Sequence, residues 1–122
     1  MKILLCDDEP SVRSIVSMML KSLDHEVTLS CDGQDALEKI QANTFDVLIT
    51  DNKMPRLSGV QLIEILREMN NPLKIIMITG FASQLNAEKK PLFDGLLIKP
   101  FRAKDILECL RNLGFQQAST PG

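Results

Sequence analysis

Acidic side chains follow two of the apolar segments in this sequence. An Asp-Asp-Glu triplet at residues 7–9 comes directly after the apolar run 2–6, and Asp51 comes directly after the run 45–50. Clustered carboxylates repel one another, which raises at least one pKa and costs stability unless a cation neutralises them. Mg²⁺ prefers such oxygen ligands and is usually completed by phosphate oxygens. The triplet taken alone could instead be an acidic first turn, which the dipole of a following helix favours.

A hydroxyl and an ammonium group follow two further apolar runs. Thr79 ends the run 74–79, and Lys99 ends the run 96–99. A hydroxyl donor and a point charge are suited to the equatorial oxygens of a phosphoryl group, where charge builds during in-line transfer. Asp51 is then the nucleophile, because a carboxylate can form an aspartyl phosphate. Together these side chains predict a phosphoryl-transfer site.

These side chains meet only if the apolar runs form one sheet. The five predicted strands are continuous apolar runs, which is typical of strands buried on both faces of a parallel sheet: 2–6, 26–30, 45–50, 74–79 and 96–99. Segments with helical spacing alternate with them: 10–23, 34–42, 58–69, 83–90 and 103–113. This order predicts a doubly wound α/β domain with right-handed crossovers. Ligands of such domains bind beyond the carboxyl ends of the strands, where the side chains above lie.

The first predicted helix carries one apolar stripe that should pack on the sheet. The stripe consists of Val12, Ile15, Val16, Met19, Leu20 and Leu23. Met18 falls off this stripe, so we expect it to be exposed and to be a candidate contact for a partner helix.

Composition excludes several other classes of protein. The chain has 122 residues, of which 44% are hydrophobic and 25% charged, so it has the size and composition of one globular domain. A net charge of −2 without a basic stripe argues against direct nucleic-acid binding. No apolar stretch approaches the roughly 18 residues of a membrane span, and no signal peptide is evident, so we expect a cytoplasmic protein without membrane contact.

The three cysteines predict neither a disulfide nor a metal site. Cys6, Cys31 and Cys109 are odd in number and form no C-x-x-C pair. We expect them to be reduced and buried as small hydrophobic side chains.

Over essentially residues 1–115, the chain resembles the receiver domain of a two-component response regulator. The family's motifs occur in order: Asp7-Asp8, D-x-x-M-P-x-x-x-G over residues 51–59, Thr79-Gly80 and Lys99-Pro100-Phe101. The resemblance implies a flavodoxin-like (βα)5 domain with strand order 2-1-3-4-5 and a cis Lys99-Pro100 bond. Residues 116–122 would be a flexible tail or a linker remnant.

The resemblance also implies roles for the site residues. Mg²⁺ would be bound by Asp8, Asp51 and the backbone carbonyl of Lys53, with Asp7 reaching it through water. The phosphoryl group would come from a sensor histidine kinase or a histidine phosphotransfer protein. Phosphorylation would change binding to a protein effector, or to an output domain outside this chain. Such a domain is not an enzyme beyond its own phosphoryl transfer and autodephosphorylation.

The sequence departs from the family pattern at positions that modulate switching. Leu96 stands where receivers commonly carry Tyr or Phe, so rotation of an aromatic ring behind Thr79 cannot operate. The 20 residues from Thr79 to Lys99 are fewer than is usual, in keeping with a weak helix at 83–90. Lys53 flanks the route of attacking water; it is either a solvated loop lysine or a group that changes metal affinity and phosphoryl lifetime. Phe81 either shields the site or packs in its loop.

Three functions compete. The first is a phosphorylatable switch. The second is an enzyme on a similar sheet, either a flavodoxin-like electron carrier or a haloacid-dehalogenase-like phosphatase. The carrier needs a Ser/Thr/Gly-rich phosphate loop after the first strand, and the phosphatase needs Asp-x-Asp there. Residues 7–9 are Asp-Asp-Glu, which argues against both. The third is a receiver-derived docking module that acts without phosphorylation, which Leu96 and the short fourth helix favour and the intact Asp51, Thr79 and Lys99 oppose.

Overall fold

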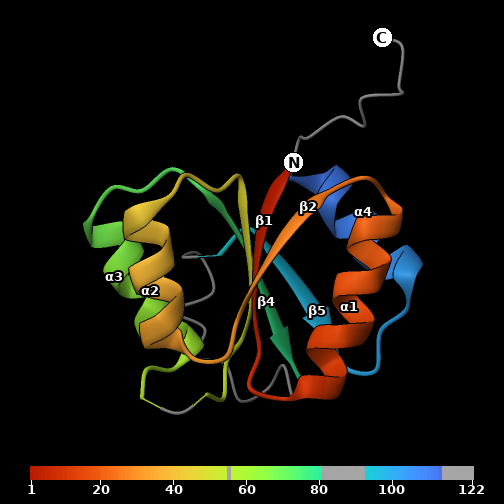
Figure 1. The fold of residues 1–122 in the computed structure, drawn as a ribbon, viewed down its shortest axis with the longest axis horizontal. Coiled ribbons are helices and arrows are strands. Elements are labelled where there is room, and N and C mark those ends of the chain that lie inside the picture. The colour runs from red at the N-terminus through yellow and green to blue at the C-terminus, as the bar shows by residue number, and fades with distance from the viewer. Residues whose placement is uncertain (55, 81–92, 114–122) are drawn as a thin grey trace, which may run out of the picture.

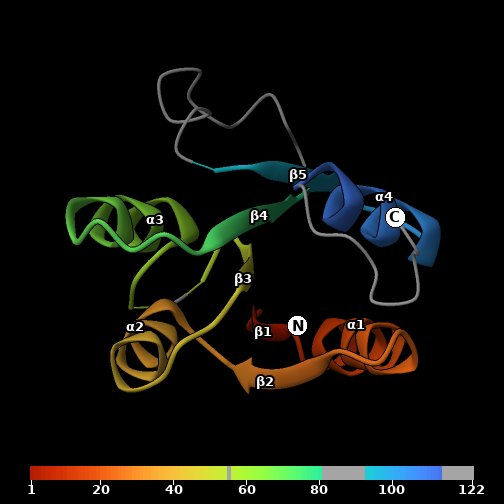
Figure 2. The same cartoon turned by 90° about the horizontal axis from the view of Figure 1, so that it is seen from above.

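Five parallel strands form one sheet in the order β2-β1-β3-β4-β5 (Figures 1 and 2). In the computed structural model the strands are β1 (Lys2–Cys6), β2 (Glu26–Ser30), β3 (Val47–Asp51), β4 (Lys74–Thr79) and β5 (Gly95–Ile98). The structure describes residues 1–54, 56–80 and 93–113. The predicted fold and strand order are therefore confirmed.

Helices cover both faces of this sheet. They are α1 (Pro10–Ser22), α2 (Gly33–Ala42), α3 (Gly59–Glu68) and α4 (Ala103–Asn112). Figure 2 shows α2 and α3 on one face and α1 and α4 on the other. The helix predicted at 83–90 and the tail 116–122 lie outside the described residues.

The central strands are continuously apolar because helices cover both faces of the sheet. Leu4 and Cys6 of β1 belong to a buried cluster with α2 and α3, whereas Ile3 and Leu5 belong to a second cluster with α1 and α4. All five residues of β3 are buried. Alternate side chains thus enter different cores, and both sets must be apolar.

Local sequence fixes where the helices begin. Pro10 occupies the first turn of α1, where its missing N–H costs nothing. The Asp32 carboxylate caps α2 by accepting a hydrogen bond from Asp35 N at 2.8 Å. Ser58 and Gln61 form a capping box at the start of α3. Because each helix follows a strand, these starts surround the carboxyl edge of the sheet.

Some burial predictions are wrong. Ile15 is 54% exposed, since α1 turns Val16, Ser17 and Leu20 toward the sheet instead. The strand at 26–30 is not buried on both faces, and Cys31, which follows it, is exposed, because β2 is an edge strand. Cys6 is buried as expected, and the exposure of Met18 is confirmed at 71%.

Two further features bear on the sequence predictions. The Lys99-Pro100 peptide bond is cis, as the resemblance implied. Within residues 1–54, 56–80 and 93–113, no helix combines the length and apolar character that a membrane crossing requires.

Candidate functional site

The carboxyl ends of four strands surround one cavity. Asp7 follows β1, while Asp51 and Thr79 are the last residues of β3 and β4, and Lys99 follows β5. The cavity has a volume of about 240 Å³ and is lined by Asp8, Glu9, Asp51, Asn52, Lys53, Thr79, Gly80 and Lys99. Residues predicted from widely separated motifs are therefore brought together at one edge of the sheet.

Four carboxylates form the acidic side of this site. Asp7, Asp8, Glu9 and Asp51 each place an oxygen within 4.8 Å of the others. Asp7 is 0% exposed and Asp51 is 6% exposed, whereas Asp8 and Glu9 face solvent. Glu9 was expected at this edge as part of the acidic triplet, but no role in the site was predicted for it.

Asp7 is the carboxylate with the least favourable surroundings. Its Oδ1 accepts a hydrogen bond from Glu9 N at 2.9 Å, but its buried Oδ2 has no partner among the described residues. Burial, reinforced by the nearby charge of Asp51, raises the pKa of Asp7 from 3.8 to about 6. A divalent cation fits this donor set, because it would both neutralise the cluster and give that oxygen a partner.

Asp51 is the best placed nucleophile of the cluster. Burial raises the pKa of its carboxyl, while Lys99 and the backbone N–H groups of Asn52 and Lys53 oppose that rise. Its Oδ2 lies 3.6 Å from Lys99 Nζ. An ionised Asp51 is thus supported by one cation and two backbone donors.

The Lys99 ammonium forms ion pairs with two carboxylates. Its Nζ lies 3.3 Å from Glu9 Oε1 as well as 3.6 Å from Asp51 Oδ2. Burial alone would lower the pKa of Lys99, but the charges of Asp51, Asp7 and Glu9 outweigh burial and raise it. Lys99 is therefore a permanent cation at the cavity.

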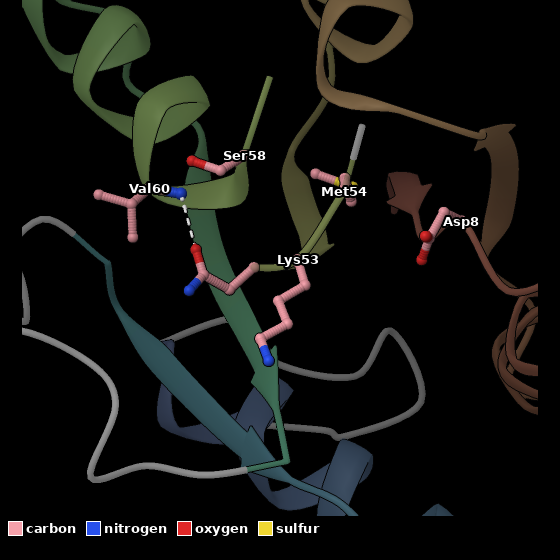
Figure 3. A pocket seen from close by; sticks show the side chains of 6 residues that line it. Asp8, Lys53, Met54, Ser58 and Val60 are labelled. Atoms are coloured by element: carbon pink, nitrogen blue, oxygen red, sulfur yellow. Dashed lines mark hydrogen bonds between the residues drawn. The ribbon is translucent and has the colours of Figure 1, made fainter. Parts of the chain in front are cut away.

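A second, more open hollow adjoins the first. It has a volume of about 680 Å³ and is lined by Asp8, Asn52, Lys53, Met54, Ser58 and Val60. Figure 3 shows the Lys53 side chain extending away from Asp8. Lys53 lines both hollows, so it lies beside the acidic cluster without its side chain being directed at Asp8.

The residue after Asp51 is hydrogen-bonded to the first residues of α3, which closes the loop between them. Asn52 O accepts a hydrogen bond from Gly59 N at 2.9 Å, and Asn52 Oδ1 accepts one from Val60 N at 3.1 Å (Figure 3). A Cβ on Gly59 would lie 2.5 Å from Asp51 O, so the motif's glycine allows the helix to approach the strand. Sequence reasoning did not identify Asn52, whose role depends on this closure.

The remaining predicted residues flank the site. Thr79 is 6% exposed at the end of β4. Leu96 is half-buried on β5, pairs in register with Met77 and packs against the cluster beneath α2 and α3. Phe81 lies outside the described residues.

Comparison with known proteins gives one consistent family. The sequence-family model of the response regulator receiver domain matches residues 3–111. The response regulator receiver protein CpdR of Brucella abortus is 34% identical over 108 residues, which are 87% of this chain and 90% of that protein.

Two further similarities are to a sensor protein and to one domain of a sensor histidine kinase. The sensor protein EvgS of Escherichia coli is 38% identical over 103 residues, 82% of this chain, and the match spans only 8% of EvgS. The receiver domain of sensor histidine kinase PA1611 from Pseudomonas aeruginosa superposes with a TM-score of 0.84 at 28% identity. That superposition covers 93% of this chain and 98% of the other, and the PA1611 structure has a magnesium ion coordinated in its active site cleft.

Proposed function

The chain belongs to the receiver domain family of response regulators, and we propose that it switches by accepting a phosphoryl group on Asp51. The observation that carries this assignment is the joint placement of three groups. A buried carboxylate at the end of β3, an ammonium 3.6 Å from it and a cluster of further carboxylates share one cavity of about 240 Å³. We take residues 1–115 as the receiver domain.

The proposed cofactor is Mg²⁺. Asp7, Asp8, Asp51 and the backbone carbonyl of Lys53 would hold it, and the unpartnered Oδ2 of Asp7 supports this choice. When bound, the ion would neutralise the carboxylates and offset negative charge on phosphoryl oxygens.

The reaction uses side chains that this chain already positions. An oxygen of Asp51 attacks phosphorus, a new P–O bond forms, and the P–N bond to the donor imidazole breaks. The leaving nitrogen keeps the electron pair and takes up a proton. Lys99 offsets charge on the phosphoryl oxygens, and the Thr79 hydroxyl donates a hydrogen bond to one of them.

Hydrolysis resets the switch. Water attacks phosphorus, the bond to Asp51 breaks, and inorganic phosphate leaves with the carboxylate restored. The chain thus acts on its own acyl phosphate and turns over no other substrate. Lys53 lines the open side of the cavity, which supports an influence on metal affinity and on the lifetime of the acyl phosphate.

The partners are those of a relay. The donor is a phosphohistidine of a sensor kinase or of a phosphotransfer protein, and the recipient of the signal is a protein effector or an output domain. Leu96 offers no aromatic ring to couple with Thr79, so we place the conformational change in the loops around the cavity.

Intact mass spectrometry tests this function. The chain, Asp51→Asn and the matched control Asp24→Asn are incubated with Mg²⁺ and acetyl phosphate. Asp24 is a suitable control because it is exposed and its φ of 65° is one that Asn tolerates. We expect one phosphoryl group on the parent and on the control, none on Asp51→Asn, and none after chelation. A folded parent that gains no mass would overturn the switch and favour a docking module that acts without phosphorylation.

A further inference from the structure

The loop that follows Asp51 is joined to Asp32, the N-cap residue of α2, by a bidentate ion pair. Arg56 Nε donates to Asp32 Oδ2 at 3.1 Å, and Arg56 Nη2 donates to Asp32 Oδ1 at 2.9 Å. Bidentate pairs of arginine with carboxylate fix orientation as well as distance. The pair therefore links this part of the loop to the start of α2, with the Arg56 side chain 58% exposed.

Asp32 is a firm anchor for this contact. It caps α2 through Asp35 N, and its backbone carbonyl accepts a hydrogen bond from Ser30 Oγ at 3.1 Å. The carboxylate side chain is only 11% exposed, and hydrogen bonds from Arg56 and from Asp35 N lower its pKa. Asp32 thus stays charged and held in one orientation.

The loop backbone is shaped to reach that anchor. Arg56 has a φ of 67°, in the left-handed region that a residue with a long side chain rarely adopts. The next residue, Leu57, packs so closely on Gly33 that a Cβ there would collide with the Leu57 carbonyl oxygen. Two neighbouring contacts therefore attach the loop to α2.

The other side of the loop is closed by Asn52. Its carbonyl and side-chain oxygens bind the backbone N–H groups of Gly59 and Val60. Lys53 lies between this closure and the contacts to α2. Contacts of Arg56 and Asn52 thus restrain the chain on either side of Lys53.

We propose that the Arg56–Asp32 ion pair is a positioning contact for the metal site, holding the loop so that the Lys53 carbonyl can serve as a ligand. Neither Arg56 nor Asp32 lines the cavity beside Asp51. The inference rests on the proposed function, because it concerns the Mg²⁺ site assigned there. Contacts that orient metal ligands from outside typically change affinity about 10- to 100-fold when removed.

Charge alone would give a different pattern from positioning. Through charge alone, removing the Arg56 cation would tighten Mg²⁺ binding, and removing the Asp32 anion would weaken it. Loss of a positioning contact weakens binding in both cases. Arg56→Lys separates the two explanations further, because it keeps the positive charge and removes the bidentate hydrogen bonding.

The experiment is calorimetric titration of the folded proteins with Mg²⁺. The variants are Arg56→Gln, Arg56→Lys, Asp32→Asn and the double variant Asp32→Asn with Arg56→Gln. Asn at position 32 can still cap α2. Lys39→Gln is the matched control, because it removes the 2.9 Å pair of Lys39 with Asp35 on the same helix without touching the loop.

We expect about tenfold weaker binding for Arg56→Gln and for Asp32→Asn, with no further loss in the double variant. Arg56→Lys should also bind more weakly than the parent, and Lys39→Gln should bind as the parent does. Urea unfolding separates loss of affinity from loss of stability. Parent-like or tighter binding by Arg56→Gln, with the parent binding Mg²⁺, would overturn the positioning role alone. A parent that binds no Mg²⁺ would overturn the proposed metal site and this inference with it.

Discussion

Replacing Asp7 with Asn should make the metal-free protein more stable. Asp7 is 0% exposed, and one of its oxygens has no hydrogen-bond partner among the described residues. Asn keeps an oxygen to accept the 2.9 Å hydrogen bond from Glu9 N. Its amide can donate to the neighbouring carboxylates, where Asp7 adds only repulsion. The substitution therefore removes a buried charge and leaves the local shape unchanged.

The size of the effect follows from the pKa of Asp7. That pKa is about 6 in the folded chain against an ordinary value of 3.8. At about 1.4 kcal/mol for each factor of ten, the difference corresponds to roughly 3 kcal/mol. Between these two pH values the folded chain holds more protons than the unfolded chain, so the parent loses stability as pH rises. Asp7→Asn should match the parent near pH 4 and exceed it by up to about 3 kcal/mol at pH 7.5.

Urea unfolding followed by circular dichroism measures this difference, since the chain has no Trp and no Tyr for fluorescence. Asp24→Asn is the control, because it removes the same charge from an exposed position. Adding Mg²⁺ to a hundred times its dissociation constant should stabilise the parent by about 2.7 kcal/mol and leave Asp7→Asn nearly unchanged. The reasoning is refuted if Asp7→Asn is the less stable protein at pH 7.5, or if its advantage does not depend on pH.

Two further outcomes are expected. Gly59→Ala should lower stability to urea by about 1–3 kcal/mol, because its Cβ would lie 2.5 Å from Asp51 O. This loss is expected although Ala is the better helix former. A more stable variant would show that β3 and α3 can move apart to admit the methyl group. Lys53→Ala should bind Mg²⁺ about threefold more tightly in calorimetry at low salt, because a cation beside the carboxylates is removed, and added salt should shrink the difference. An unchanged affinity would place the ammonium out of reach of the ion.

The strands could be predicted closely because each one lies in a continuous apolar run. The bounds of β1, β2 and β4 match the sequence prediction. The strand expected at 96–99 spans Gly95–Ile98 instead, and the strand expected at 45–50 spans Val47–Asp51. Asp46 explains the later start of β3, since its carboxylate accepts a hydrogen bond from Lys2 N at 2.8 Å. Periodicity does not reveal such a tertiary contact. It also failed at Ile15, because burial on α1 depends on how the helix sits on the sheet.

The site was predictable to the extent that a parallel sheet gathers the carboxyl ends of its strands. Asp51, Thr79 and Lys99 were identified in that way, and the structure brings them to one cavity. The contacts between loops were not, because polar loop residues carry no periodic signal. Glu9 meets Lys99 across 90 positions of sequence, and Arg56 meets Asp32 across 24. Both pairs exist only once the sheet has formed.

The shared position of Lys99 indicates where phosphorylation is felt first. Its ammonium lies 3.3 Å from Glu9 and 3.6 Å from Asp51, so neither carboxylate holds it alone. Phosphorylation replaces the single negative charge of Asp51 by about −1.5 to −2 charges and adds several strong acceptor oxygens, which shifts that balance away from Glu9. Glu9 directly precedes α1, so a change at Glu9 reaches the start of that helix. Leu96 on β5, by contrast, has no aromatic ring that could respond to a movement of Thr79. We therefore expect the response to begin at the start of α1, and amide hydrogen exchange there should change on phosphorylation even where β5 does not.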